Sequence, residues 1–180
     1  MVYVLLGTGF EETEAIVPVD LLRRAGIPVM TVGINGKTVY GGHSIGIEAD
    51  ILLEEMDLSK MDMIVLPGGL GGVASIRGSK PAMDAVRYAW ENGKYTAAIC
   101  AAPTILAELG ISDGRNATCY PGCEANMGAA IVTADHACVQ DGNLITGASA
   151  GCAAPFGLAL IRALKGKETA DKVAQQIVIR

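Results

Sequence analysis

The strongest constraint on the fold is a series of short, mainly apolar runs, each followed by a turn and then by a segment with helical spacing. Val2–Leu6, Met63–Leu66 and Tyr95–Ile99 are the clearest of these runs. Strands that read as continuous apolar runs are buried on both faces, which is typical of a parallel sheet between helices. The sequence therefore predicts an α/β sandwich with a mostly parallel sheet.

The other expected elements continue this alternation. Helices are predicted at residues 11–25, 80–90, 103–109, 156–164 and 169–177, and further strands at 27–34, 116–119, 130–133 and 144–146, with irregular strands in 43–53. Asn35–Gly36 is a hairpin-turn signal that would join strand 27–34 to an extended segment from Thr38. The length of 180 residues, with no repeat or linker, predicts one domain over 1–180.

Charge and hydropathy argue against several classes of protein. The net charge is −5 and the basic residues are scattered, whereas a nucleic-acid binder needs a basic face. No run approaches the roughly 18 apolar residues of a membrane-spanning helix, and residues 1–7 lack the basic region of a signal peptide. We therefore expect a cytoplasmic protein whose five cysteines are reduced thiols.

Cys100 is the first candidate for chemistry. It follows the predicted strand Tyr95–Ile99 and precedes Pro103, which can open the next helix. A thiol at this place lies near unpaired backbone N–H groups and the positive end of a helix dipole, and both favour the thiolate. The alternative is that Cys100 is a small buried hydrophobic residue, which free cysteines often are.

Glu14 is the second candidate. It belongs to an acidic cluster with Glu11 and Glu12 at the start of the first predicted helix, where acids also stabilise the helix dipole. Pro18 lies four residues later and has no N–H for the Glu14 carbonyl, so we expect a kink that interrupts the helix there. Such an interruption would favour a positioned, functional side chain.

A glycine-rich run, Gly68–Gly72, follows the strand Met63–Leu66. Its N–H groups could form an anion nest or an oxyanion hole, or the glycines could serve only a tight turn. The run is not a P-loop, because the Gly-Lys-Ser/Thr ending is missing.

Histidines and metal ligands are scarce. His43 and His136 are the only histidines, and neither follows Cys100 directly, so nothing favours a Cys-His-Asp triad. Cys119, Cys123 and His136 do not make four well-spaced ligands, and we expect no zinc site.

Several segments together resemble the ThiJ/PfpI superfamily, and within it the branch of the human parkinsonism-associated protein and the bacterial chaperone YajL. The matching pieces occur in the family's order over nearly the whole chain: 9–20, Arg23–Gly26, 65–69, 97–103, 118–121, 141–146 and 163–168. The resemblance implies a flavodoxin-like three-layer sandwich that forms a homodimer, related to class I glutamine amidotransferases. Arg23, Arg24 and His43 match positions near the family's dimer interface.

The resemblance also implies roles for individual residues. Cys100 matches an oxidation-prone nucleophile, and Glu14 matches a carboxyl group hydrogen-bonded to it. Gly69 and Ala101 match the backbone groups of an oxyanion-hole-like site, with Gly68 and Tyr120 as further pocket residues. No metal or other cofactor is implied.

Two departures from the family pattern bear on activity. Peptidase-like members carry histidine where this chain has Ala101, so peptidase activity is not expected. Animal members of the nearer branch have histidine where Tyr120 stands, which leaves the role of Tyr120 open.

Two functions follow from the resemblance. The first is a cofactor-free glyoxalase or protein deglycase acting on methylglyoxal or its adducts, with Cys100 as nucleophile and Glu14 as the proton carrier. The alternative is a non-enzymatic redox sensor or chaperone that responds to oxidation of Cys100. Both predict a lowered pKa for the Cys100 thiol. In a third hypothesis, Cys119 or Cys123 forms a disulfide with oxidised Cys100.

Overall fold

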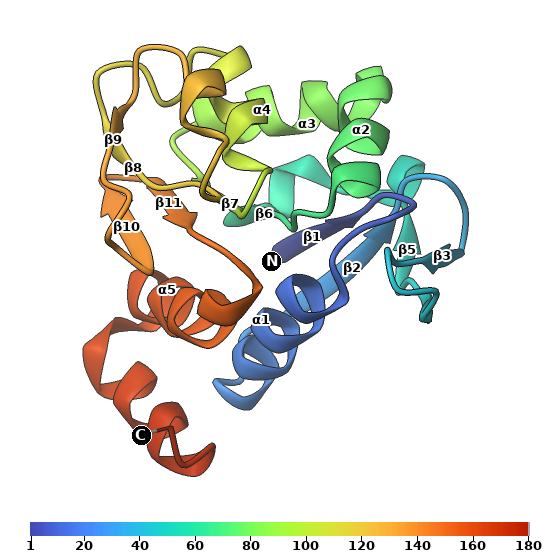
Figure 1. The fold of residues 1–180 in the computed structure, drawn as a ribbon. Coiled ribbons are helices and arrows are strands. Elements are labelled where there is room, and N and C mark those ends of the chain that lie inside the picture. Colours follow the sequence, from blue (N-terminus) through green and yellow to red (C-terminus); the bar gives the residue numbers. More distant parts are fainter. Residues whose placement is uncertain (180) are drawn as a thin grey trace.

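A central seven-stranded sheet organises the molecule (Figure 1). The computed structural model describes residues 1–179. The strand order is β10-β11-β7-β6-β1-β2-β5, and every pairing is parallel except that of the edge strand β10 with β11. The strands are β1 (Val2–Leu6), β2 (Val29–Gly33), β5 (Ile51–Leu52), β6 (Met63–Leu66), β7 (Tyr95–Ile99), β10 (Cys138–Asp141) and β11 (Leu144–Gly147).

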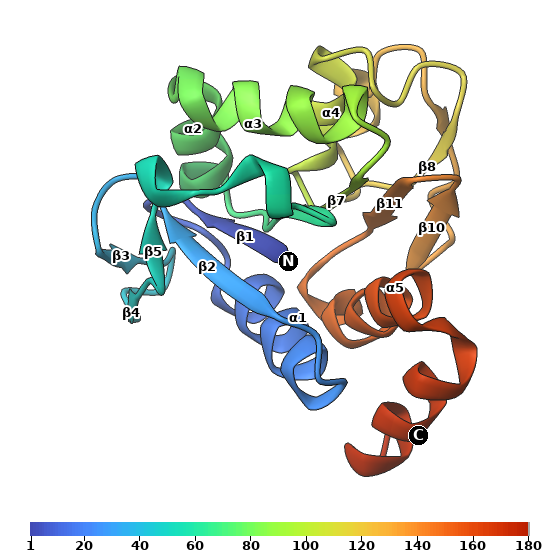
Figure 2. The same ribbon diagram turned by 180° about the vertical axis from the view of Figure 1, so that it is seen from behind.

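Helices cover both faces of this sheet, as the sequence predicts (Figures 1 and 2). The helices are α1 (Glu12–Arg24), α2 (Leu70–Gly78), α3 (Lys80–Glu91), α4 (Pro103–Glu108) and α5 (Ala153–Gln176). Side chains of β1 alternate between the two layers, because successive residues of a strand point to opposite faces. Val4 and Leu6 join the core beneath α1 and α5, whereas Leu5 joins the core beneath α2, α3 and α4.

The predicted hairpin at Asn35–Gly36 does not form. The chain turns there, but β3 (Thr38–Tyr40) pairs with β4 (Gly46–Glu48) in a separate antiparallel ribbon, and β2 pairs with β5 in parallel. The Asn35 side chain instead accepts a hydrogen bond from the N–H of Thr8 at 3.0 Å. A second small ribbon joins β8 (Asn116–Ala117) to β9 (Ile131–Val132) in parallel.

Two further expectations about helices need correction. The glycine-rich run is a loop only through Gly69, because α2 begins at Leu70 and includes Gly71 and Gly72. The predicted interruption at Pro18 is also wrong, since α1 continues through it to Arg24. By contrast, the two helices predicted near the end of the chain correspond to α5, which is broken by non-helical angles at Gly166.

The carboxyl ends of β1, β6 and β7 lie side by side in the sheet, because Val4 pairs with Val65 and Leu66 pairs with Ala98. The loops that follow these strands therefore meet at one edge, where reactive groups of open α/β sheets gather. Among the described residues, no helix combines the length and the apolar character required to cross a membrane.

Candidate active site

Cys100 occupies a strained turn directly after β7. Its φ of 67° places a non-glycine residue in the left-handed region, which costs roughly 1–2 kcal/mol and is tolerated only where the surroundings enforce it. The Cys100 N–H donates to the carbonyl of Gly147 at 2.9 Å, and its carbonyl accepts from the N–H of Tyr120 at 2.8 Å. The residue is partly exposed. The turn thus presents the sulfur at the sheet edge.

Glu14 approaches the same point from the first turn of α1, and it is fully buried. Its Oε2 atom accepts the N–H of Gly68 at 2.9 Å, and the carbonyl of Gly68 accepts the N–H of Glu11 at 3.0 Å. The Oε1 atom is buried and has no partner of ordinary hydrogen-bond geometry among the described residues. The carboxyl lies close enough to the Cys100 thiol for each to affect the other's pKa.

The two glycines after β6 allow this close approach. A Cβ atom on Gly68 would lie 2.5 Å from Oε2 of Glu14 and 2.7 Å from Cβ of Cys100. Gly69 has a φ of 83° and caps α2, and a Cβ on it would lie 2.5 Å from the carbonyl oxygen of Gly9. Side chains other than hydrogen therefore cannot be accommodated at either position without displacing the site.

Burial governs the electrostatics of the pair. Burial raises the pKa of Glu14 to about 7, against hydrogen bonds from Cys100 and Gly68 that lower it. Burial and the charge of an ionised Glu14 raise the pKa of the Cys100 thiol to about 12, although the N–H groups of Ala101 and Gly69 lower it. A lowered thiol pKa, as expected from the turn alone, is therefore not what these surroundings produce when Glu14 is ionised.

The two values belong to the pair rather than to either residue, because interacting groups titrate in common steps. The first proton leaves at about 7 and the second at about 12. Between these steps the pair shares one proton and carries one negative charge. The Cys100 sulfur and the Glu14 carboxyl therefore titrate together.

Tyr120 contributes to the turn through its backbone, and its side chain is exposed. Cys119 is buried and Cys123 partly exposed, and each pKa is raised, first by burial. Cys123 lines a surface cavity of about 600 Å³ that also reaches Ala101. A disulfide between either of these cysteines and Cys100 stays a prediction.

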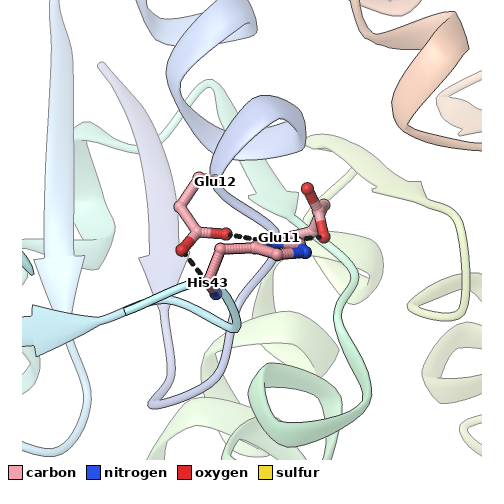
Figure 3. Close-up of side chains that lie close together, drawn as sticks. All are labelled: Glu11, Glu12 and His43. Atoms are coloured by element: carbon pink, nitrogen blue, oxygen red, sulfur yellow. Dashed lines mark hydrogen bonds and ion pairs between the residues drawn. The ribbon is translucent and has the colours of Figure 1, made fainter. Parts of the chain in front are cut away.

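The only described group of three side chains that could hold a metal ion lies beside this site (Figure 3). His43 Nδ1 lies 3.0 Å from Oε2 of Glu12 and 3.7 Å from Oε2 of Glu11. Glu12 also accepts the backbone N–H of His43 at 2.8 Å. Burial opposes ionisation of Glu12, but hydrogen bonds from His43 and neighbouring N–H groups lower its pKa, and Glu12 in turn raises the pKa of His43. The group forms an ion pair that ties the β3–β4 ribbon to α1.

The fold and the turn together define an α/β protein with a cysteine in a left-handed turn at the carboxyl edge of its sheet. The sequence model of the DJ-1/PfpI family matches residues 1–163. The Drosophila melanogaster protein dj-1beta is 39% identical over 178 residues, which cover 98% of this chain and 95% of that protein. The chain belongs to the DJ-1/PfpI family.

Structural comparison gives the same relationship. The crystal structure of Drosophila DJ-1beta superposes with a TM-score of 0.93 and 38% identity, covering 99% of this chain and 97% of that one. Toxoplasma gondii DJ-1, solved in an oxidized state, has a TM-score of 0.92 and 29% identity, covering 98% and 97%. The fold is therefore the flavodoxin-like fold of these relatives. A Pyrococcus abyssi protein named a deglycase is 31% identical over 146 residues, covering 81% of this chain and 87% of that protein.

Proposed function

We propose that this chain is a cysteine-dependent, cofactor-free enzyme of the glyoxalase or protein-deglycase type, acting on methylglyoxal or its adducts through Cys100. The observation that carries the proposal is the buried Glu14 carboxyl beside a partly exposed thiol that faces two backbone N–H groups. This arrangement supplies a nucleophile, a proton carrier and an oxyanion site, which carbonyl addition needs. The relative named a deglycase supports the same reaction class.

In the singly ionised pair, we place the negative charge on the sulfur. A carboxylate at Glu14 would be fully buried and would receive one backbone N–H, from Gly68. Cys100 is partly exposed as a residue, and its sulfur faces the N–H groups of Gly69 and Ala101. Burial disfavours a charge most where no water reaches it. Protonated Glu14 can then donate to the thiolate from its otherwise unpartnered Oε1.

The first chemical step is addition to the aldehyde. The Cys100 thiolate forms a bond to the aldehyde carbon, and the π electrons of the C=O bond move onto oxygen. The oxyanion accepts hydrogen bonds from the N–H groups of Gly69 and Ala101. The proton of Glu14 passes to this oxygen, giving a neutral hemithioacetal and a Glu14 carboxylate.

The second step is an internal rearrangement. The Glu14 carboxylate removes the proton from the carbon that bears sulfur, and the resulting enediol is protonated at the neighbouring carbon. The hemithioacetal becomes a lactate thioester with no net oxidation. Water hydrolyses the thioester, releases lactate and restores the thiol–carboxyl pair. Because the pair loses its first proton at about 7, about half of the molecules hold a thiolate beside a protonated Glu14 near neutral pH, which is the form that the addition step needs.

Lactate formation from methylglyoxal tests this proposal. Cys100→Ser and Glu14→Gln should each lower turnover by at least about a hundred-fold, the range of effects for a nucleophile or a proton carrier. Cys152→Ser removes a partly exposed thiol outside the described site and serves as the matched control. Unchanged turnover in both site variants would remove the proposal, and a buffer blank corrects for spontaneous conversion.

A redox-sensor or chaperone function is the second candidate, supported by the same turn. A sulfinate on Cys100 could accept hydrogen bonds from the Ala101 and Gly69 N–H groups and from protonated Glu14. Mass spectrometry after mild peroxide treatment tests it. Oxidation of Cys100 should precede that of the other four cysteines, and the reverse order contradicts the sensor.

We also propose that the partner of this chain is a second copy, and that it works in the cytoplasm, where its free thiols stay reduced. Ile16 on α1 and Tyr40 and Ile45 on the β3–β4 ribbon are exposed large hydrophobic residues. Apolar surface of this kind is typical of a subunit interface. Light scattering should report a dimer, and Ile16→Glu should shift it toward the monomer; a monomeric wild type contradicts the proposal.

A further inference from the structure

The geometry points to Thr104 and Arg77 as positioning residues that hold Ala101 in place in the turn after β7, which carries Cys100. The inference rests on the proposed function of Cys100, because it concerns the N–H group that faces its sulfur. Neither residue touches the reacting atoms. Both act through the backbone of Ala101.

Thr104 makes two hydrogen bonds to the same carbonyl. Its hydroxyl donates to the Ala101 oxygen at 2.7 Å, and its N–H donates to that oxygen at 3.2 Å. Thr104 is buried, with 7% of its surface exposed. A threonine bonded to the carbonyl three residues earlier is common at a helix start, so these bonds alone would only stabilise α4.

Arg77 is the unusual member, because it reaches this hydroxyl from another helix. Its Nη2 donates to Oγ1 of Thr104 at 2.9 Å, while its Nε donates to Oε2 of Glu108 at 2.6 Å. The guanidinium carries only donors and is always charged. Because the Thr104 oxygen accepts a hydrogen bond from Arg77, the Thr104 hydroxyl proton is directed toward the Ala101 carbonyl. The positive charge of Arg77 strengthens the Arg77–Thr104 hydrogen bond and, through it, the Thr104–Ala101 hydrogen bond.

The result is that Ala101 is held on both sides. The peptide before it is fixed by the Tyr120 N–H, which donates to the Cys100 carbonyl at 2.8 Å. The peptide after it is fixed by Thr104 and, through Thr104, by Arg77. Cys100 itself has a φ of 67°, and a residue in that region keeps it only when neighbouring groups enforce it. The Ala101 N–H belongs to the peptide that Tyr120 holds, so releasing the Thr104 side should let this peptide tilt and draw the N–H away from the sulfur.

The surroundings make the inference testable without unfolding the protein. Arg77 and Thr104 line the cavity of about 600 Å³ that also reaches Ala101, and 40% of the Arg77 side chain is exposed. Replacing Arg77 therefore leaves no buried hole. The charged groups facing Thr104 are Arg77 and Glu108, and Glu14 faces the sulfur from α1.

The experiment compares Thr104→Val, Thr104→Ser and Arg77→Met by the pH profile of Cys100 alkylation. The Ala101 N–H lowers the pKa of the thiol, so its loss should move the profile to higher pH. Losing one hydrogen bond corresponds to an upward shift of about 0.7 pH units in the midpoint of the profile of Thr104→Val. Arg77→Met should show a smaller shift, and Thr104→Ser should restore the wild-type profile.

Two matched controls separate positioning from general damage. Arg87→Met removes an arginine paired with Asp84 on α3, and Thr169→Val removes a threonine hydroxyl bonded to the Lys165 carbonyl on α5. Neither should move the profile. A folded Thr104→Val protein, verified by circular dichroism, whose profile coincides with that of the wild type overturns the inference, as does a shift that serine fails to restore.

The alkylation readout does not depend on turnover. Absence of lactate formation by the wild type would remove the glyoxalase proposal and leave the positioning inference standing on the profile. If the enzyme is active, Thr104→Val should lower kcat about five-fold with KM nearly unchanged, because the Ala101 N–H acts on the developing oxyanion. A rise in KM alone contradicts this role.

Discussion

Replacing Glu14 with leucine tests where the charge of the pair resides. The variant removes a fully buried carboxyl and keeps a side chain of similar size. In the wild type the thiol–carboxyl pair loses its first proton at about 7, the pKa of Glu14, and with the charge placed on sulfur as proposed above, that step yields the Cys100 thiolate. Without the donor, burial of the thiol is opposed only by backbone N–H groups, and we expect its pKa to return to at least the ordinary 9.0.

Two opposing effects set the size of the change in the Cys100 alkylation rate. At about pH 7 the thiolate fraction falls from about one half to about one hundredth, which is roughly fifty-fold. The more basic thiolate is about ten-fold more nucleophilic for a difference of two pKa units. Alkylation of Glu14→Leu should therefore be about five-fold slower at pH 7, equal to wild type at about pH 8, and faster above it.

The assay is the rate of iodoacetamide addition to Cys100, followed by mass spectrometry across the pH range. Glu14→Gln keeps a donor and should lie closer to the wild type. Asp20→Asn changes an exposed acid on the same helix and should have no effect. A Glu14→Leu profile with a lower midpoint, or one that never crosses the wild type, refutes the placement of the charge on sulfur and shows that the carboxylate carries it.

Three further outcomes are expected. Gly68→Ala should lower turnover more than about ten-fold while circular dichroism stays native, because its Cβ would collide with Glu14 and Cys100. In His43→Gln, urea midpoints should fall most relative to wild type between about pH 4.5 and 6.5. Because the pKa of His43 is raised and that of Glu12 is lowered, the ion pair stabilises the fold fully in this pH window. Its stabilisation is lost as pH rises through the folded-state pKa of His43, or as pH falls through the folded-state pKa of Glu12. Leu160→Ala, in the core beneath α5, should reduce the free energy of unfolding by about 2–5 kcal/mol in urea titrations.

The layers of the fold were predictable because they depend on local patterns. The apolar run of β1 is buried on both sides, and its residues alternate between two cores. The break at Gly166 also followed from the sequence, since the helical spacing stops there. The hairpin at Asn35–Gly36 failed because a turn signal does not specify which strands pair, and β2 finds β5 instead.

The start of α2 was not predictable from local propensity. Gly71 and Gly72 are poor helix formers, but in the structure a Cβ on Gly72 would lie 2.7 Å from Cα of Phe10. The helix is placed by this close packing against the loop after β1, which no local pattern reveals. The contact between Arg77 and Thr104 was missed for a similar reason, because 27 residues separate them.

The site residues were easier to find than their electrostatics. The sequence shows a cysteine directly after a buried strand and an acid at the start of the first helix. The structure brings these two residues, Cys100 and Glu14, together. The helix dipole and the turn alone predict a lowered thiol pKa. Burial and the charge of an ionised Glu14 act in the opposite direction, and the latter couples the two groups.

This coupling constrains how the two proposed functions can coexist. Addition to an aldehyde and oxidation by peroxide both need the Cys100 thiolate, and both use the same N–H groups of Gly69 and Ala101 for the oxygen that results. A sulfinate on Cys100 is a weaker nucleophile than a thiolate, because its two oxygens withdraw electron density from sulfur; it cannot form the thioester, and it occupies the donors that the oxyanion needs. A single molecule can therefore serve as catalyst or as oxidised sensor, but not as both at once, and peroxide should abolish lactate formation in proportion to the fraction of Cys100 oxidised.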